Sequence, residues 1–124
     1  MKRDLRLFIE DILENIDLIQ DSTKKLSLRD FKSNKLIIDA TIRRLEIIGE
    51  AAKNIPDDFR KRYPKIPWRD IAGFRDVVTH AYFGVILEKV WEVIKKDIPD
   101  LEKKIKLILS DMQQQDKTRQ KSNK

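Results

Sequence analysis

The chain has 124 residues, of which 39% are charged, and a formal net charge of +6, which suits one soluble domain around a single hydrophobic core. It has no cysteine, which excludes disulfides, thiolate metal sites and a thiol nucleophile, and its three glycines and four prolines are too few for a β-barrel or sandwich. No apolar run approaches the roughly 20 residues that span a membrane, and the N-terminus lacks the core of a signal peptide, so we expect a cytoplasmic protein with no membrane contact.

Apolar residues recur at helical spacing from the start of the chain. The stripe from Leu5 to Ile19 predicts a first amphipathic helix that ends near Ser22. A second and longer helix is expected from about Asp30 to Asn54, and Pro56 stops it. The apolar face of this second helix is broad, which indicates packing on two sides, either as the central helix of a monomer or partly as a dimer interface.

The middle of the chain is divided by prolines. Residues 57–63 can form one or two helical turns, and Pro67 suits the first position of a third helix that should end near Gly84. A fourth helix is expected over residues 87–94.

The C-terminal part is also helical in pattern. Pro99 is expected to break or kink the chain, with Asp100 available as the N-cap of a final helix that carries the apolar residues from Leu101 to Met112. Because no segment has the pattern of a strand, the sequence predicts an all-α antiparallel up-and-down bundle of four to five helices.

Residues 116–124 form a polar end to the chain. Four basic residues stand there against Asp116, which gives this stretch a charge of +3, half of the total. We therefore expect a helical domain over residues 1–115 and a basic, disordered tail over residues 116–124. The remaining charge of the domain permits a polyanionic ligand without arguing strongly for one.

The segment from Arg75 to Tyr82 contains the only histidine of the chain, His80. Arginine can hold a phosphate with a planar fork of donors, and histidine can transfer a proton near neutral pH. These are the groups that metal-free cleavage of a phosphodiester requires. The alternative is structural: a lone histidine is more often part of a core, Arg75 could pair with an acid, and Tyr82 could pack near a helix end.

Helical geometry limits how Arg75 and His80 can act together. At about 100° per residue they lie about 140° apart around a straight helix, whereas Arg75 and Tyr82 are nearly aligned. The two groups can converge only if the helix unwinds near His80 or if a second subunit completes the site. A two-fold dimer would supply two histidines, and cleavage by a 2′-hydroxyl needs both a base and an acid.

A basic cluster lies just before this segment and contains Arg60, Lys61, Arg62, Lys65 and Arg69, with Tyr63 and Trp68 between them. Basic residues with exposed aromatics suit contacts to single-stranded RNA. The alternative is that the two aromatics pack against the loop and the charges are solvated. One histidine without cysteine lacks the ligand spacing of a zinc site, so we expect neither a metal nor a cofactor.

The order of several motifs resembles a known family. Arg75-x4-His80-x-Tyr82 matches the Arg-x4-His-x-Tyr motif of HepT-like proteins, which belong to the HEPN superfamily. Three further blocks, at residues 48–53, 66–73 and 82–85, resemble that family in order and spacing. The likeness covers roughly residues 1–112, and the ordered set of blocks is far more specific than the short motif alone.

The resemblance implies a HEPN helical bundle that forms a two-fold homodimer and acts as a metal-independent ribonuclease, with Arg75 and His80 as its active-site positions. It further implies the toxin of a toxin–antitoxin pair. The partner would be a small nucleotidyltransferase of the MntA type, which uses ATP to attach AMP to the motif tyrosine, here Tyr82. A negative phosphate on Tyr82 would repel RNA from Arg75 and His80.

The sequence departs from the family pattern at two positions. Asp76 stands where a polar amide is common, and a carboxylate there could modulate the charge offered to RNA or raise the pKa of His80. Ile86 replaces a common aspartate and so removes an N-cap. Two other functions remain open: a binding module that presents RNA or a nucleotide to a nucleotidyltransferase without cleaving it, and a purely structural dimerisation bundle.

Overall fold

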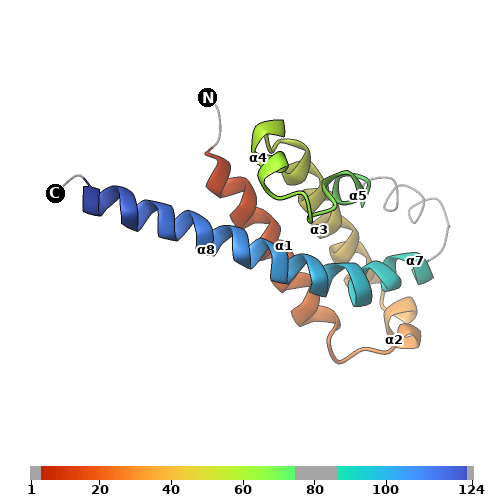
Figure 1. Ribbon diagram of the computed structural model, residues 1–124. Helices are drawn as coiled ribbons and strands as arrows, with labels where there is room; N and C mark the ends of the chain where they lie inside the picture. Colours follow the sequence, from red (N-terminus) through yellow and green to blue (C-terminus); the bar gives the residue numbers. More distant parts are fainter. Residues whose placement is uncertain (1–3, 75–86, 123–124) are drawn as a thin grey trace.

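The computed structural model describes residues 4–74 and 87–122, which are helical and contain no strand within those ranges. This confirms the all-α prediction. In chain order the elements are α1 (Leu5–Thr23), α2 (Leu28–Ser33), α3 (Lys35–Lys53), α4 (Asp57–Arg62), α5 (Trp68–Ala72), α7 (Leu87–Glu92), the π-helical turn η1 (Val93–Asp97) and α8 (Ile98–Ser122) (Figure 1).

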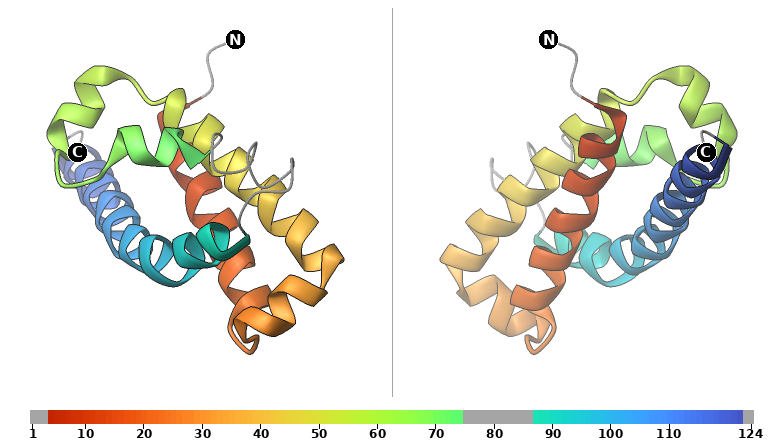
Figure 2. Two further views of the ribbon diagram at one scale, coloured as in Figure 1. Left: turned by 90° about the vertical axis from the view of Figure 1, so that its right-hand side faces the viewer. Right: turned by 90° about the vertical axis from the view of Figure 1, so that its left-hand side faces the viewer.

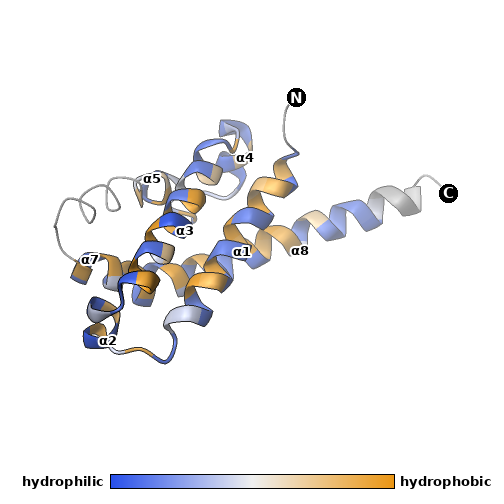
Figure 3. Cartoon of the chain, turned by 180° about the vertical axis from the view of Figure 1, so that it is seen from behind, coloured by the Kyte–Doolittle hydropathy of each residue, from blue (hydrophilic) through white to orange (hydrophobic). Residues whose placement is uncertain are grey.

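Helices α1 and α3 run antiparallel and pack side by side, and the long helix α8 crosses the bundle next to α1 (Figure 2). The predicted stripe of α1 is the centre of the core, because Ile9, Ile12, Ile16 and Ile19 are fully buried. The hydropathy of α1 and α3 alternates around each helix in the manner of an amphipathic helix (Figure 3). None of the helices in the described ranges is long and apolar enough to cross a bilayer.

The connection between α1 and α3 differs from the prediction of a single helix from Asp30. Two helices occur instead, because Ser27 and Asp30 form a capping box that starts α2, with hydrogen bonds of 3.1 and 3.2 Å. Asn34 then leaves the helical conformation, and its side-chain oxygen accepts from the backbone N–H of Ile37 at 3.1 Å. Asparagine at this position therefore ends one helix and caps the next.

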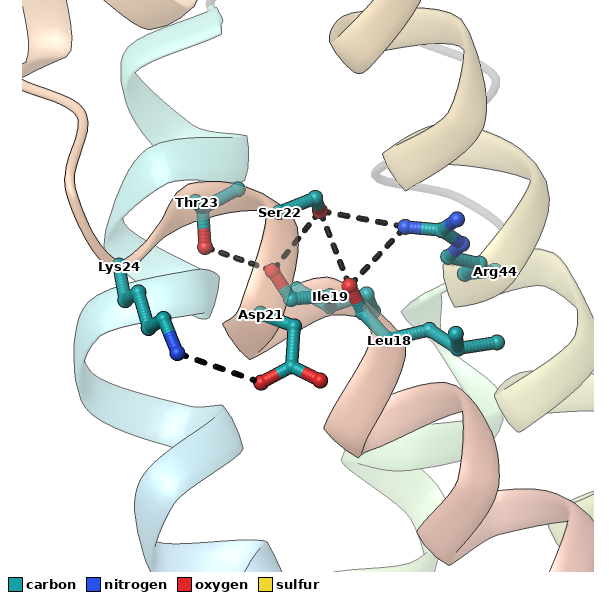
Figure 4. Close-up of polar contacts among 7 residues, drawn as sticks. All are labelled: Leu18, Ile19, Asp21, Ser22, Thr23, Lys24 and Arg44. Carbon is teal, nitrogen blue, oxygen red and sulfur yellow. Dashed lines mark hydrogen bonds and ion pairs between the residues drawn. The ribbon is translucent and has the colours of Figure 1, made fainter.

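The C-terminal end of α1 is fixed to α3 by one arginine. Arg44 donates from Nη1 to the backbone oxygen of Leu18 at 3.0 Å and to Oγ of Ser22 at 3.1 Å (Figure 4). A cation favours the negative end of the helix dipole, so Arg44 stabilises both the end of α1 and its contact with α3.

Of the two outcomes predicted at Pro99, a break or a kink, the break does not occur, because α7, η1 and α8 follow one another without interruption. A proline inside an α-helix lacks an N–H group and its ring clashes with the carbonyl four residues earlier, here that of Lys95. The wider π turn over Val93–Asp97 contains that residue and accommodates the ring. Asp100 is consequently part of the first turn of α8, where it pairs with Lys104 at 2.8 Å rather than acting as an N-cap.

The end of the chain also differs from the predicted disordered tail. Helix α8 continues through Ser122 and extends past the bundle (Figure 1), so residues 116–122 are helical. An ion pair between Arg6 of α1 and Asp116 ties this extension to the bundle, in a stretch whose glutamine and lysine residues favour a helix. The domain boundary at residue 115 stays a prediction.

Candidate functional site

The motif residues Arg75, Asp76, His80 and Tyr82 lie outside the described residues, and so do the predicted helix end at Gly84 and Ile86. Their roles therefore stay predictions. The structure does define where the chain enters and leaves this segment. It enters from α5 through Gly73 and Phe74, and it leaves into α7.

The entry point is firmly packed. Helix α5 contacts α3, and its residues Trp68 and Ile71 are buried together with Phe74. Gly73 allows a close approach of the backbone, because a Cβ atom there would lie 3.2 Å from the carbonyl oxygen of Asp70. The buried side chains therefore fix the last residues before Arg75, and the backbone leaves little room for a side chain at position 73.

Both aromatic residues of the basic cluster contact other residues of the fold: Trp68 packs in the core, and Tyr63 forms a ring contact and a hydrogen bond. Trp68 is only 7% exposed, and its indole N–H donates to the backbone oxygen of Tyr63 at 3.1 Å, so its ring faces are not available to an RNA base. The ring of Tyr63 packs against Phe59 at 5.1 Å between centroids, and its hydroxyl donates to Asp111 at 3.1 Å. Burial, aided by this carboxylate, raises the pKa of Tyr63.

Arg60 has a structural role within the basic cluster. Its Nη2 donates to the backbone oxygens of Ala52 at 2.7 Å and Lys53 at 3.1 Å, and its Nε donates to that of Ile55 at 3.0 Å. Ala52 and Lys53 belong to the last turn of α3, whose carbonyls lack the N–H groups of a following helical turn, and Ile55 lies just beyond the helix. The guanidinium therefore caps α3 and joins it to α4.

The other four members of the cluster are differently placed. Lys61, Arg62, Lys65 and Arg69 are exposed, and none forms an ion pair with another residue of the two described ranges. They occupy α4, the following loop and α5, the part of the chain that leads into the motif. We refer to these four residues as the exposed basic group.

A cavity of about 380 Å³ lies on the side of α5 that faces η1 and α8. Its lining combines apolar residues with Arg69 and the carboxylates of Asp70, Asp97 and Asp100. Partial burial, with the nearby charges of Glu92, Asp70 and Asp100, raises the pKa of Asp97. Within the described ranges no group of three histidine, cysteine, aspartate or glutamate residues is placed to hold a metal ion.

No pattern in the sequence indicates this cavity. Asp70 and Asp97 are distant along the chain, and only the packing of α5 near the α8 helix brings them together. The same packing leaves α5 with carboxylates on its cavity side, while the exposed basic group begins on α4. Charge of opposite sign thus borders the entry to the motif segment.

Comparison with known proteins places these features in a family. The family model described as "Ribonuclease HepT-like" matches residues 12–108, which include the motif segment and both of its attachment points. The chain belongs to the HepT-like family. No solved structure gives a significant match to this member of the family.

Several HepT-like relatives cover most of the chain. A protein of Thermococcus cleftensis, provisionally named a ribonuclease HepT, is 49% identical over 104 residues, which is 84% of this chain and 94% of the relative. A provisionally named RNase of Caldanaerobacter subterraneus is 45% identical over 84% of this chain and 93% of its own length.

A third relative is longer than this chain. It comes from Methanocaldococcus jannaschii, its name combines a gamma-glutamylcyclotransferase with a provisional RNase, and it is 47% identical over 112 residues. The match covers 90% of this chain but only 50% of that relative, so the chain spans half the length of that protein.

Proposed function

We propose that this HepT-like protein is a metal-independent ribonuclease whose active site is formed by Arg75 and His80. The observation that carries the proposal is the family match over residues 12–108, which spans the Arg-x4-His-x-Tyr motif and the packed elements on either side of it. The provisional RNase names of relatives that are 45–49% identical support the same activity.

The proposed reaction needs only groups that the motif supplies. A base removes the proton of the 2′-hydroxyl, whose oxygen attacks phosphorus, and an acid protonates the departing 5′-oxygen, which leaves a 2′,3′-cyclic phosphate. His80 transfers protons, and Arg75 holds the phosphate and stabilises the charge that grows on it. Because the chain has one histidine, a homodimer would place two histidines and two arginines around a shared cleft.

The first test is cleavage of a mixed RNA pool by the purified protein in EDTA. We expect cyclic-phosphate ends from the parent and no cleavage by folded His80→Ala or Arg75→Ala. Arg43→Ala is the matched control, because it also removes one positive charge but lies on α3, where Arg43 pairs with Glu46 at 3.2 Å. Undiminished cleavage by a folded, nuclease-free His80→Ala preparation would contradict the proposal. Binding of RNA by the parent without turnover would favour the non-catalytic binding module.

We further propose that the protein is the toxin of a toxin–antitoxin pair and that an MntA-type nucleotidyltransferase silences it by adenylylation of Tyr82. The family resemblance and the position of Tyr82 two residues after His80 support this proposal. A bulky anion there would exclude an RNA phosphate from the site.

The two tyrosines of the chain make a sharp test of the silencing step. After incubation with ATP and a candidate nucleotidyltransferase, intact mass spectrometry should show one added adenylyl group on the parent and on Tyr63→Phe, but none on Tyr82→Phe. Tyr63 is the matched control, because its hydroxyl is already bonded to Asp111. Modification of Tyr82→Phe would contradict the assignment.

A further inference from the structure

The way in which the chain leaves the motif segment is determined by α7. This helix begins at Leu87, seven positions after His80 and five after Tyr82. Leu87 packs against the core and Val90 is fully buried within it. The contacts of the first turns of α7 therefore determine where the C-terminal end of the motif segment is attached.

Helix α2 contacts those first turns at two points. Lys32 forms an ion pair with Glu88, and the ring of Phe31 lies 5.3 Å from that of Trp91, between centroids. Glu88 and Trp91 are three residues apart and so share one face of α7. We call Phe31, Lys32, Glu88 and Trp91 the α2–α7 clamp.

The clamp combines one apolar and one charged contact. Phe31 is fully buried, and Lys95 lies 4.6 Å from the centre of the Trp91 ring, where a cation is attracted to the aromatic face. The ammonium of Lys32 lowers the pKa of Glu88 through its hydrogen bond, which favours the charged form of the Glu88 carboxylate.

Helix α2 can act as a fixed support because both of its ends are defined. The capping box of Ser27 and Asp30 starts it, Asn34 ends it and begins α3, and α2 also packs against α3. A six-residue helix has little stability of its own, so its position follows from these caps and from its contacts. Helix α7 is therefore linked through α2 to α3, which packs against α1 in the centre of the bundle.

We infer that Lys32 is a positioning residue for the cleavage reaction, acting through Glu88 on the attachment of the segment that carries His80 and Tyr82. The inference rests on the proposed ribonuclease function. An exposed ion pair contributes little to global stability, and the side chains of Lys32 and Glu88 are 43% and 50% exposed. Its loss should therefore affect the geometry of the reaction more than folding, and a displacement of about 1 Å can cost on the order of 100-fold in rate.

The test compares kcat and KM of the full-length protein for Lys32→Glu, Glu88→Lys and the exchanged pair Lys32→Glu/Glu88→Lys. We expect each single variant to lower kcat about three- to tenfold, a fraction of the loss that a full 1 Å displacement brings. KM and Tm should be nearly unchanged, and the exchanged pair should restore kcat to within about twofold of the parent, because it restores the ion pair with reversed charges.

Lys96→Glu is the matched control. It makes the same charge change as Lys32→Glu and lies in the continuous helix that carries Glu88, but Lys96 pairs with Glu92 of that helix at 3.3 Å and does not join α2 to α7. We expect it to leave kcat unchanged. Lys32→Gln replaces Lys32→Glu if the latter does not fold.

The outcomes separate the two proposals. If the parent cleaves RNA but Lys32→Glu retains the parental kcat, the positioning role is overturned while the ribonuclease stands. A rise in KM that the exchanged pair does not restore would also overturn it, because Lys32 would then contact RNA directly. If the unmodified parent does not cleave, the ribonuclease itself fails and the positioning role fails with it.

Discussion

At the scale of single residues, Thr41 carries an energetic cost that one substitution can remove. It is fully buried in α3, and within the described part of the chain its hydroxyl has no hydrogen-bond partner. Valine has the same branched shape without the hydroxyl, so Thr41→Val should raise the free energy of unfolding by about 1 kcal/mol, since an unpaired buried hydroxyl costs about 1–3 kcal/mol. Urea denaturation followed by circular dichroism would measure the change.

Thr23 is the matched control for this substitution. It is equally buried, but its hydroxyl donates to the backbone oxygen of Ile19 at 2.7 Å. Thr23→Val should therefore lower the free energy of unfolding, by about 1 kcal/mol for the lost hydrogen bond. Equal effects of the two substitutions would show that the Thr41 hydroxyl is satisfied after all.

Asp97 is expected to make stability depend on pH. Partial burial and the carboxylates of Glu92, Asp70 and Asp100 raise its pKa in the folded protein above the ordinary value of 3.8. The folded state then binds a proton more readily than the unfolded state does. The contribution of Asp97 is therefore most favourable below pH 3.8 and is lost as the pH rises through the raised value.

Asp97→Asn removes the cost of an ionised carboxylate at this partly buried, acidic position, so it should raise Tm at pH 7. It should give no advantage at about pH 3, where Asp97 is protonated. Melting curves between pH 3 and pH 7 would follow the difference. Asp58→Asn is the control: this exposed acid lies in the first turn of α4, where the helix dipole favours a carboxylate, so its loss should not stabilise the protein at pH 7. A Tm gain for Asp97→Asn that is the same at every pH would contradict the electrostatic explanation.

At the scale of elements, the end of α3 depends on Arg60. Arg60→Met keeps the aliphatic stem but removes the donors to the carbonyls of Ala52, Lys53 and Ile55. Hydrogen bonds from a charged group contribute about 1.5–3 kcal/mol, so we expect a loss of about 2 kcal/mol in the free energy of unfolding. Chemical denaturation would measure it, with Arg43→Met as a control that should change stability by less than about 0.5 kcal/mol, since Arg43 is an exposed surface residue.

If Arg60→Met were neutral for stability but weakened RNA binding, the capping role would be wrong and the RNA-contact prediction would gain support. Stability and binding must therefore be measured on the same preparation of each variant.

The elements also show where sequence patterns suffice. The isoleucines of α1 are buried as their spacing predicts, because an amphipathic period fixes which face a helix presents to a core. At Asn34 and Pro99 the structure does not follow from the sequence pattern alone. A helix break at Asn34 depends on a local capping bond that competes with a continuous helix, and continuation through Pro99 depends on a π turn before it. Asparagine and proline at these positions permit either a continuous helix or a break, and the local capping bond and the π turn decide which of the two forms.

At the scale of the whole molecule, the sequence predicts the chemistry of the candidate site but not the packing around it. The motif could be recognised because Arg75, His80 and Tyr82 lie close together in the chain. The cavity beside α5 and the α2–α7 clamp could not, because Asp70 and Asp97, like Lys32 and Glu88, are joined only by the packing of distant helices. Within the basic cluster, packing also separated Arg60 from the four exposed residues.

The position of the exposed basic group predicts how RNA binding responds to salt. Lys61, Arg62 and Lys65 are exposed and lie on and after α4, which precedes α5 and the motif segment in the chain, while Asp70, Asp97 and Asp100 line the cavity beside α5. We therefore expect RNA to approach the motif along the exposed basic group rather than across the carboxylates of the cavity. For single strands each phosphate contact adds about 0.7 to the slope of log K against log salt concentration, so loss of all three charges should reduce the slope by about 2.

The measurement uses the His80→Ala background, so that RNA is bound without being cleaved, and fluorescence anisotropy at several salt concentrations. The variant Lys61→Ala/Arg62→Ala/Lys65→Ala is compared with Lys25→Ala/Arg29→Ala/Lys35→Ala, which removes the same charge from exposed residues around α2. These residues lie before α3 or at its first residue, and the 19 residues of α3, about 28 Å at the helical rise, lead from there toward α4. Only the first variant should lower the slope; an equal fall in both would mean that RNA responds to total charge rather than to a defined path beside the motif.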